Sequence, residues 1–141
     1  MFVASRGCPR RATRNRKGTA TVELAVCLPI LMVVAMGSIE ATNAIFLKDR
    51  LTSAAYQGAR AATTPGQTSA GATTVASNVL TQFSISGGQV TITPTVTAST
   101  ATGTQVTVSV TAPFSSNSWM HTFIVGNILS NVTATVVMDH Q

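Results

Sequence analysis

The stretch that decides the fold is LAVCLPILMVVAMGSI, residues 24–39, which contains no charged residue and is flanked by Glu23 and Glu40. At about 1.5 Å per residue it makes a helix of about 24 Å, which is shorter than a hydrocarbon core of about 30 Å. The uncharged neighbours, residues 19–22 and 41–47, can extend the helix at both ends. We therefore predict one membrane-spanning helix, with Glu23 and Glu40 within the membrane or at its border.

The positive charge of the chain is concentrated before this helix. Six of the nine basic residues precede Gly18, and the other three are accompanied by four acidic residues. The positive-inside rule places such a basic leader in the cytoplasm and the C-terminal part on the other side of the membrane. The leader does not indicate nucleic-acid binding, because a membrane helix follows it at once and no aromatic residues are interleaved with it.

Three residues in or beside the apolar run carry separate expectations. Pro29 removes one helical hydrogen bond, and we expect a kink there, not a break. Glu23 needs a partner, because an unpaired charge at the centre of a membrane helix costs about 2.5–3.5 kcal/mol. Cys8 lies in the leader and Cys27 in the apolar run, so we expect no disulfide between them.

A short motif stands immediately before the apolar run. Arg16 and Lys17 are followed by Gly18, then by four residues, then by Glu23 and the hydrophobic segment. This order resembles the processing site of type IV prepilins, in which a membrane-bound prepilin peptidase cuts after the glycine on the cytoplasmic side. A glycine suits such a bond because it enters a protease cleft without a side-chain clash. The resemblance implies cleavage between Gly18 and Thr19.

Residues 18–62 resemble the N-terminal region of TadE-like proteins, the minor pseudopilins of tight-adherence (Flp-type) pilus systems. The resemblance is carried by TVELA (21–25), Pro29, GSIE (37–40), LTSAA (51–55) and GARAA (58–62). It implies a single-pass protein of the bacterial inner membrane that assists pilus assembly or adhesion. Its implied partners are the membrane, a prepilin peptidase, sibling pseudopilins and the major pilin. The chain departs from the family at Leu24 and Ala41, where an aromatic residue is frequent.

The resemblance also implies roles for single residues. Glu23 would neutralise the new N-terminal amine, on Thr19, of a neighbouring subunit. An ammonium and a carboxylate attract each other strongly at low dielectric, whereas either one alone is unfavourable. The remaining candidate residues are expected to shape helix packing: Pro29, Gly37, Glu40 and Gly58.

The helix is expected to continue through residues 45–62 and to present small residues on one face. Leucine, alanine and glycine recur there at helical spacing: Leu47, Leu51, Ala54, Ala55, Gly58 and Ala62. Small side chains allow close approach between helices. Two interpretations stay open, a bundle with other chains and a stalk that packs on its own domain.

The fold class expected from the whole chain is α+β, in three parts: a leader (1–18), the long helix (19–62) and an outer domain (63–141). Thr-Thr-Pro-Gly at 63–66 should end the long helix. A second helix is predicted over about 69–83, with Val75, Val79, Leu80 and Phe83 on one side. Alternating residues at 89–97, 105–111 and 131–138 predict a small antiparallel sheet, in which Pro94 makes the first strand an edge or a bulge.

An apolar loop, residues 119–129, lies between the last two predicted strands. It is either folded under the sheet or offered to a partner. Asp139 is the single charged residue after position 60, which favours a domain that functions assembled or tethered.

The composition argues against an enzyme. His121, His140 and one outer carboxylate cannot readily form an acid/base pair or a metal site, and Asp139 and His140 are expected at a frayed terminus. We therefore expect no catalytic residue, no cofactor, no metal and no small-molecule substrate.

The alternative function is a secreted, threonine-rich binding module released by signal peptidase. Ala35 and Gly37 precede Ser38 in an arrangement that such a peptidase accepts. The mature N-terminus distinguishes this alternative from the pseudopilin.

Overall fold

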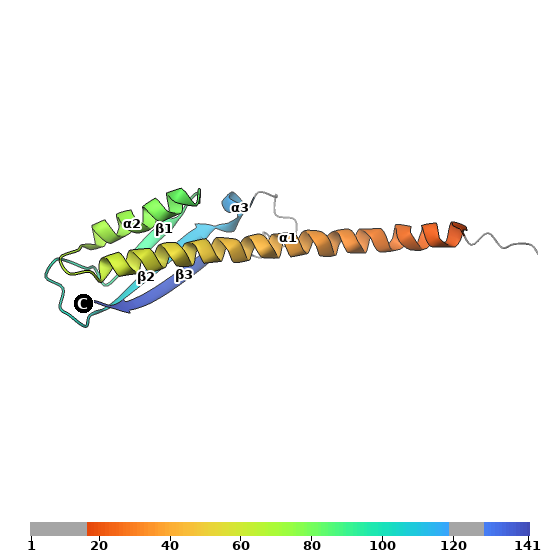
Figure 1. Cartoon of the computed structure of the whole chain (residues 1–141). Helices are drawn as coiled ribbons and strands as arrows, with labels where there is room; N and C mark the ends of the chain where they lie inside the picture. The colour runs from red at the N-terminus through yellow and green to blue at the C-terminus, as the bar shows by residue number, and fades with distance from the viewer. Residues whose placement is uncertain (1–16, 119–128) are drawn as a thin grey trace, which may run out of the picture. The chain divides into compact units, whose positions relative to one another are not determined.

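The protein is described here by a computed structural model that covers residues 17–118 and 129–141, with the side chain of Lys17 left out. Its elements, in chain order, are α1 (Lys17–Ala62), α2 (Ser69–Gln82), β1 (Gln89–Thr93), β2 (Gln105–Pro113), α3 (Phe114–Asn117) and β3 (Asn131–Asp139) (Figure 1). A long apolar helix, a second helix and a three-stranded antiparallel sheet confirm the predicted α+β class. The four-residue helix α3 was not predicted. The apolar loop lies almost wholly outside the described residues.

Internal contacts divide the chain into two units, one ending at Ala35 and the other spanning Met36–Gln141. Helix α1 contributes its first part to the first unit and its remainder to the second. This boundary falls inside the helix. The division into a leader, a long helix and an outer domain from residue 63 stays a prediction.

The first part of α1 is apolar and exposed. The helix runs through Pro29 without a break, and residues 18–35 are exposed all around it. The segment Gly18–Ala62 contains a window with a mean hydropathy of 2.3, so α1 is long and apolar enough to cross a membrane, judged by length and composition alone. A helix that is apolar on every side and has no protein around it matches a lipid environment better than water.

The second part of α1 buries its small-residue face in the core of the outer unit. The fully or nearly buried residues follow helical spacing: Leu47, Leu51, Ala54, Ala55, Ala59 and Ala62. The structure thus places this face against the chain's own domain, which is one of the two interpretations left open by the sequence.

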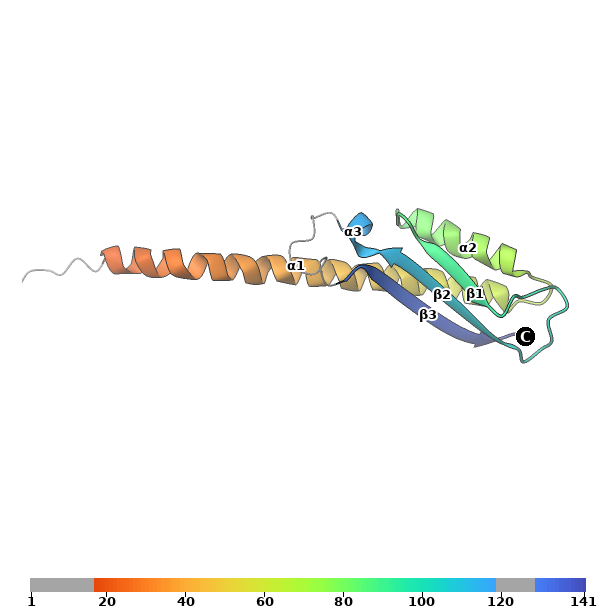
Figure 2. The same cartoon turned by 180° about the vertical axis from the view of Figure 1, so that it is seen from behind.

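The sheet has the order β1-β2-β3, with β2 paired antiparallel to both neighbours. Val108 at its centre is opposite Ile92 on one side and Val136 on the other. In β2 the valines Val106, Val108 and Val110 are completely buried while their neighbours are partly exposed. Helices α1 and α2 cover this valine face, and none of the described helices lies on the other face (Figures 1 and 2).

At Gly58, α1 approaches α2 and the sheet closely. A Cβ atom built on Gly58 would lie 3.0 Å from Cβ of Ala76 in α2 and 3.5 Å from Cγ1 of Val108 in β2. The first distance is tighter than normal packing, so any larger side chain must push the two helices apart. The glycine therefore sets the spacing between α1, α2 and the sheet.

The close contact at Gly58 also explains a wrong detail of the sequence analysis. Val75 and Phe83, predicted on the packed side of α2, are 37% and 38% exposed. Ala72 and Ala76 are completely buried in their place, next to Val79 and Leu80, which were predicted correctly. Only alanine fits opposite Gly58, so the alanine face turns toward α1.

The first strand is shorter than predicted because Pro94 has no amide hydrogen for the sheet. Hydrogen bonds to the start of α2 hold the chain just beyond Pro94. Ser69 at the start of α2 donates its backbone amide to the carbonyl of Val96 (2.9 Å) and accepts the Val96 amide on its hydroxyl (2.6 Å). Val96, predicted as a strand residue, is consequently 1% exposed although it lies outside β1.

The C-terminus is tied down and not frayed, contrary to the sequence expectation. The backbone of His140 exchanges hydrogen bonds with Gly103 (2.7 Å) and Thr104 (2.8 Å), and the amide of Gln141 donates to the carbonyl of Thr63 (3.2 Å). The His140 side chain is 5% exposed. These bonds join the end of the chain to the end of α1.

Replacing Gly58 with valine should destabilise the outer unit by about 1–3 kcal/mol, because the added methyl groups overpack the contact with Ala76. Hydrogen exchange of the β2 amides in the detergent-solubilised chain measures the free energy of opening. Gln57→Val is the matched control, since Gln57 is exposed on the same helix. Equal protection in the two variants would show that the contact does not limit packing.

Candidate functional site

The predicted scissile bond lies in the first turn of α1. Gly18 and Thr19 follow Lys17, where the helix begins, and both are exposed. A Cβ built on Gly18 meets no atom within 4 Å. The fold itself therefore places no steric demand on a glycine at this position, in contrast to Gly58.

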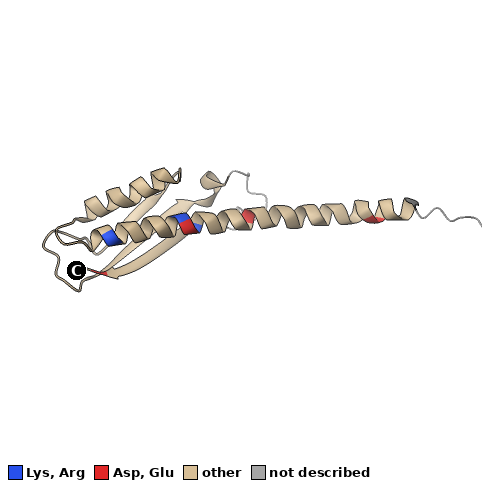
Figure 3. Cartoon of the chain, viewed as in Figure 1, with Lys and Arg blue, Asp and Glu red and all other residues tan. Residues whose placement is uncertain are grey.

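Glu23 lies one turn further along the same exposed part of α1. Its side chain is exposed, and no hydrogen bond or ion pair is described for it. It is the single charged residue between Gly18 and Ile39, which can be followed along α1 in Figure 3. A carboxylate set in an apolar helix without a partner among the described residues is expected to find one elsewhere once the helix is in lipid.

The other predicted packing residues lie in different surroundings. Pro29 is within the exposed apolar part of α1, and Gly37 is half-buried in the outer unit. Glu40 is only 1% exposed and has an interaction within the chain. The sequence placed Glu40 at a membrane border, but the structure encloses its side chain in protein. Nothing in the run of residues around Glu40 signals this burial.

The structure does not bring all predicted residues together. Gly18, Thr19, Glu23 and Pro29 share the first unit, whereas Gly37, Glu40 and Gly58 belong to the second. They form a series along one helix, and no described geometry joins the two groups into a pocket.

Catalytic and metal-binding groups were not expected, and the described part of the chain contains no group of three or more His, Cys, Asp or Glu residues that could hold a metal ion. Cys27 is a free, exposed thiol on α1. Both ring nitrogens of the buried His140 are without a hydrogen-bond partner among the described residues.

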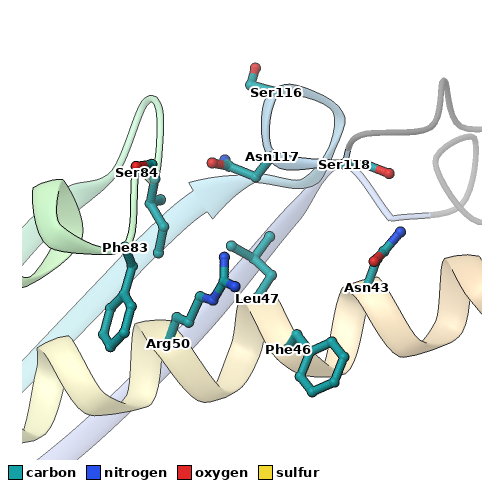
Figure 4. Close-up of a pocket in the computed structure, with 10 residues that line it drawn as sticks. Asn43, Phe46, Leu47, Arg50, Phe83, Ser84, Ser116, Asn117 and Ser118 are labelled. Atoms are coloured by element: carbon teal, nitrogen blue, oxygen red, sulfur yellow. The ribbon is translucent and has the colours of Figure 1, made fainter.

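Sequence reasoning missed a recess beside α1 in the outer unit. It has a volume of about 350 Å³ and is lined by residues from α1, from the turn after α2 and from α3 with its following residue (Figure 4). Segments so far apart in the chain cannot be recognised as neighbours from their local patterns.

Comparison with known proteins gives one match. The family model described as TadE-like protein matches residues 18–60, and this confirms the resemblance for the N-terminal region, which is less than a third of the chain. No curated protein and no solved structure shows a significant match. The matched region contains the candidate scissile bond, Glu23 and Gly58, while the sheet lies outside it.

The two glutamates should respond differently to replacement by alanine. Glu40→Ala should lower the free energy of unfolding of the outer unit by about 1–3 kcal/mol, because it empties a buried site. Glu23→Ala should change it by less than about 0.5 kcal/mol, because Glu23 has no described partner. Hydrogen exchange of the β2 amides measures both. A large loss in Glu23→Ala would contradict an intermolecular role for Glu23.

Proposed function

We propose, from the TadE-like character of residues 18–60, that the chain is a membrane-anchored minor pseudopilin that assists the assembly of a Tad/Flp-type pilus. The match suggests involvement in such pilus systems, and the single apolar helix suggests membrane anchoring. Prepilin peptidase would remove the leader, and the outer domain would lie on the extracytoplasmic side of the inner membrane.

The observation that carries the proposal is the division of α1. One continuous helix has an apolar part exposed on all sides and a part buried in a small domain. A lipid bilayer, or a bundle of similar helices, can cover the first part without altering the domain. A helix divided in this way is expected in a subunit that moves from a membrane into an assembly.

Processing would prepare the chain for assembly. Cleavage after Gly18 frees the α-amine of Thr19, four residues before Glu23. Within one helix, residues four apart lie near each other, but the carboxylate of a neighbouring subunit can also reach the amine. In the low-dielectric membrane, pairing of these two charges between subunits would fix their axial register. The proposed partners are therefore sibling pseudopilins and the major pilin, together with the peptidase.

The small-residue face of α1 is less suited to contacts with those partners, because the domain already covers it. Helix packing between subunits would use the part before Ala35, including the bend expected at Pro29. The alternative, a secreted binding module, predicts instead that everything before Ser38 is removed. That cut would take away the apolar part of α1 and leave the buried part in place.

We expect the mature chain to begin at Thr19 when a cognate prepilin peptidase is co-expressed. Intact mass and N-terminal sequencing of the membrane-extracted protein measure this. Gly18→Ala should retain the leader, because the added methyl group obstructs the protease cleft, while Gly37→Ala should be processed like the wild type. A terminus at Ser38 in all three proteins would contradict the pseudopilin and support the secreted module.

The same preparations test the role of Glu23. Glu23→Gln should be processed normally and yet fail to cross-link to sibling subunits, because the amide carries no charge to pair with the Thr19 amine. Undiminished cross-linking would show that Glu23 does not form the proposed contact with the Thr19 amine of a neighbouring subunit.

A further inference from the structure

The recess beside α1 is built by three separated segments of the outer unit. Asn43, Leu47 and Arg50 come from one face of α1, two turns apart at their extremes, and Figure 4 shows Leu47 between the other two. The remaining lining residues are Phe46, Phe83, Ser84, Ile85, Ser116, Asn117 and Ser118. We call this cavity the Arg50 recess.

The wall opposite α1 is held by Asn117. Its side-chain oxygen accepts a hydrogen bond from the Ser86 amide (2.8 Å), and its Nδ2 donates to the carbonyls of Ser86 (2.9 Å) and Pro113 (2.8 Å). These bonds tie α3 to the turn that leads into β1. Asn117 is therefore occupied in shaping the recess and is not available to a ligand.

Two donors of the recess are available. The Arg50 guanidinium carbon lies 5.9 Å from the centre of the Phe83 ring, and no carboxylate is described as its partner. The Nδ2 atom of Asn43 is buried and has no acceptor among the described residues. A buried amide without an acceptor is unfavourable, so it indicates a missing acceptor. A cation and an amide donor without acceptors select a ligand with anionic oxygens.

The position of the recess along α1 indicates the source of those oxygens. The uncharged run ends at Ile39, inside the same unit. Asn43 follows about 6 Å later and Arg50 about 16 Å later along the helix, and side chains on a helix lean back toward its N-terminus. The headgroup layer of a bilayer is about 5–8 Å thick on each side. Asn43 would thus lie within the headgroup layer, and Arg50 would lie above it with a side chain that leans back toward the headgroups.

The exposed residues beside the recess also fit a position at the membrane interface. Phe46 is 56% exposed and Ile45 is 61% exposed, and Lys48 is also exposed between them and Arg50. Aromatic and basic residues concentrate at membrane interfaces, where an apolar body and a charged tip are both satisfied.

We propose that the Arg50 recess binds the headgroup of an anionic phospholipid from the outer leaflet of the membrane. Arg50 pairs with the phosphate, and Asn43 donates to a further oxygen of the same lipid. This inference rests on the membrane anchoring proposed above. Such binding would hold the outer domain against the membrane surface until the subunit leaves the membrane during assembly.

Native mass spectrometry of the full chain in mild detergent tests the proposal, with dioleoyl phosphatidylglycerol and dioleoyl phosphatidylcholine as probes. The wild type should retain the anionic lipid, and Arg50→Gln should retain about fivefold less of it, the effect of one basic residue near a membrane surface. Arg60→Gln is the matched control, because Arg60 is exposed on the same helix outside the recess. The basic leader contributes equally in all three proteins.

Further variants separate the possible outcomes. Arg50→Lys should keep most of the preference for the anionic lipid, and Asn43→Ala should weaken it, with unchanged hydrogen exchange in β2 showing that both fold. Equal retention by the wild type and Arg50→Gln overturns the proposal. Displacement of the lipid by inorganic phosphate also overturns it, because the recess would then be a free-phosphate site. Loss of co-purifying protein in Arg50→Gln without any change in lipid retention would assign the recess to an acidic partner.

Alkaline extraction of membranes distinguishes failure of this inference from failure of the proposed function. If the chain resists extraction but shows no lipid preference, only the proposal of the headgroup site fails. If alkali releases the chain, the membrane anchoring on which both proposals depend is contradicted.

Discussion

The contact between Gly58 and Ala76 determines how the rest of the outer unit is arranged. Because α1 and α2 approach each other so closely there, both can lie on the valine face of the same narrow sheet. A larger residue at position 58 would separate the two layers and expose Val108, the most central residue of the sheet. The alanines on both helices therefore fit the close contact, and Leu47 and Leu51 are buried on the same face of α1.

This packing commits the second part of α1 to the domain, whereas residues 18–35 are exposed in the part of the chain that the structure describes. An apolar helix that is exposed all around has few stable environments in water, so a bilayer or a helix bundle must supply one. Asp139 is the single charged residue after position 60, and this scarcity of charge agrees with a domain that is kept in place by an anchor (Figure 3).

The two glutamates at the ends of the apolar run illustrate this division. Glu40 is enclosed by its own domain, whereas Glu23 has no described partner in the chain. Only the second arrangement leaves a charge available to another subunit. A pairing between Glu23 and the Thr19 amine would make assembly depend on prior processing, because the amine does not exist until the leader is removed.

Much of this fold could be predicted from local sequence patterns, and the limits have physical causes. The long helix, its end before Pro65, the second helix and all three strands follow from periodicity and from turn residues, which act over a few positions. The packed side of α2 was predicted only in part, because the burial of Ala72 and Ala76 depends on the distant Gly58. Burial of Glu40 and His140 and the Arg50 recess were missed for the same reason, since each arises from contacts between separated segments. The candidate scissile bond and Glu23 were accessible to sequence reasoning because their motif is contiguous.

The central claim is that α1 passes from the bilayer into an external domain near Ile39. Labelling of single cysteines in intact cells with a membrane-impermeant maleimide tests it most directly, in a background where Cys8 and Cys27 are replaced by alanine. Leu31, Thr52 and Gln57 are all exposed in the isolated chain, so protein packing does not shield them. The account predicts that Thr52→Cys and Gln57→Cys are labelled from outside, while Leu31→Cys is labelled only after detergent is added. Labelling of Leu31→Cys in intact cells, or of Thr52→Cys only after lysis, would contradict it.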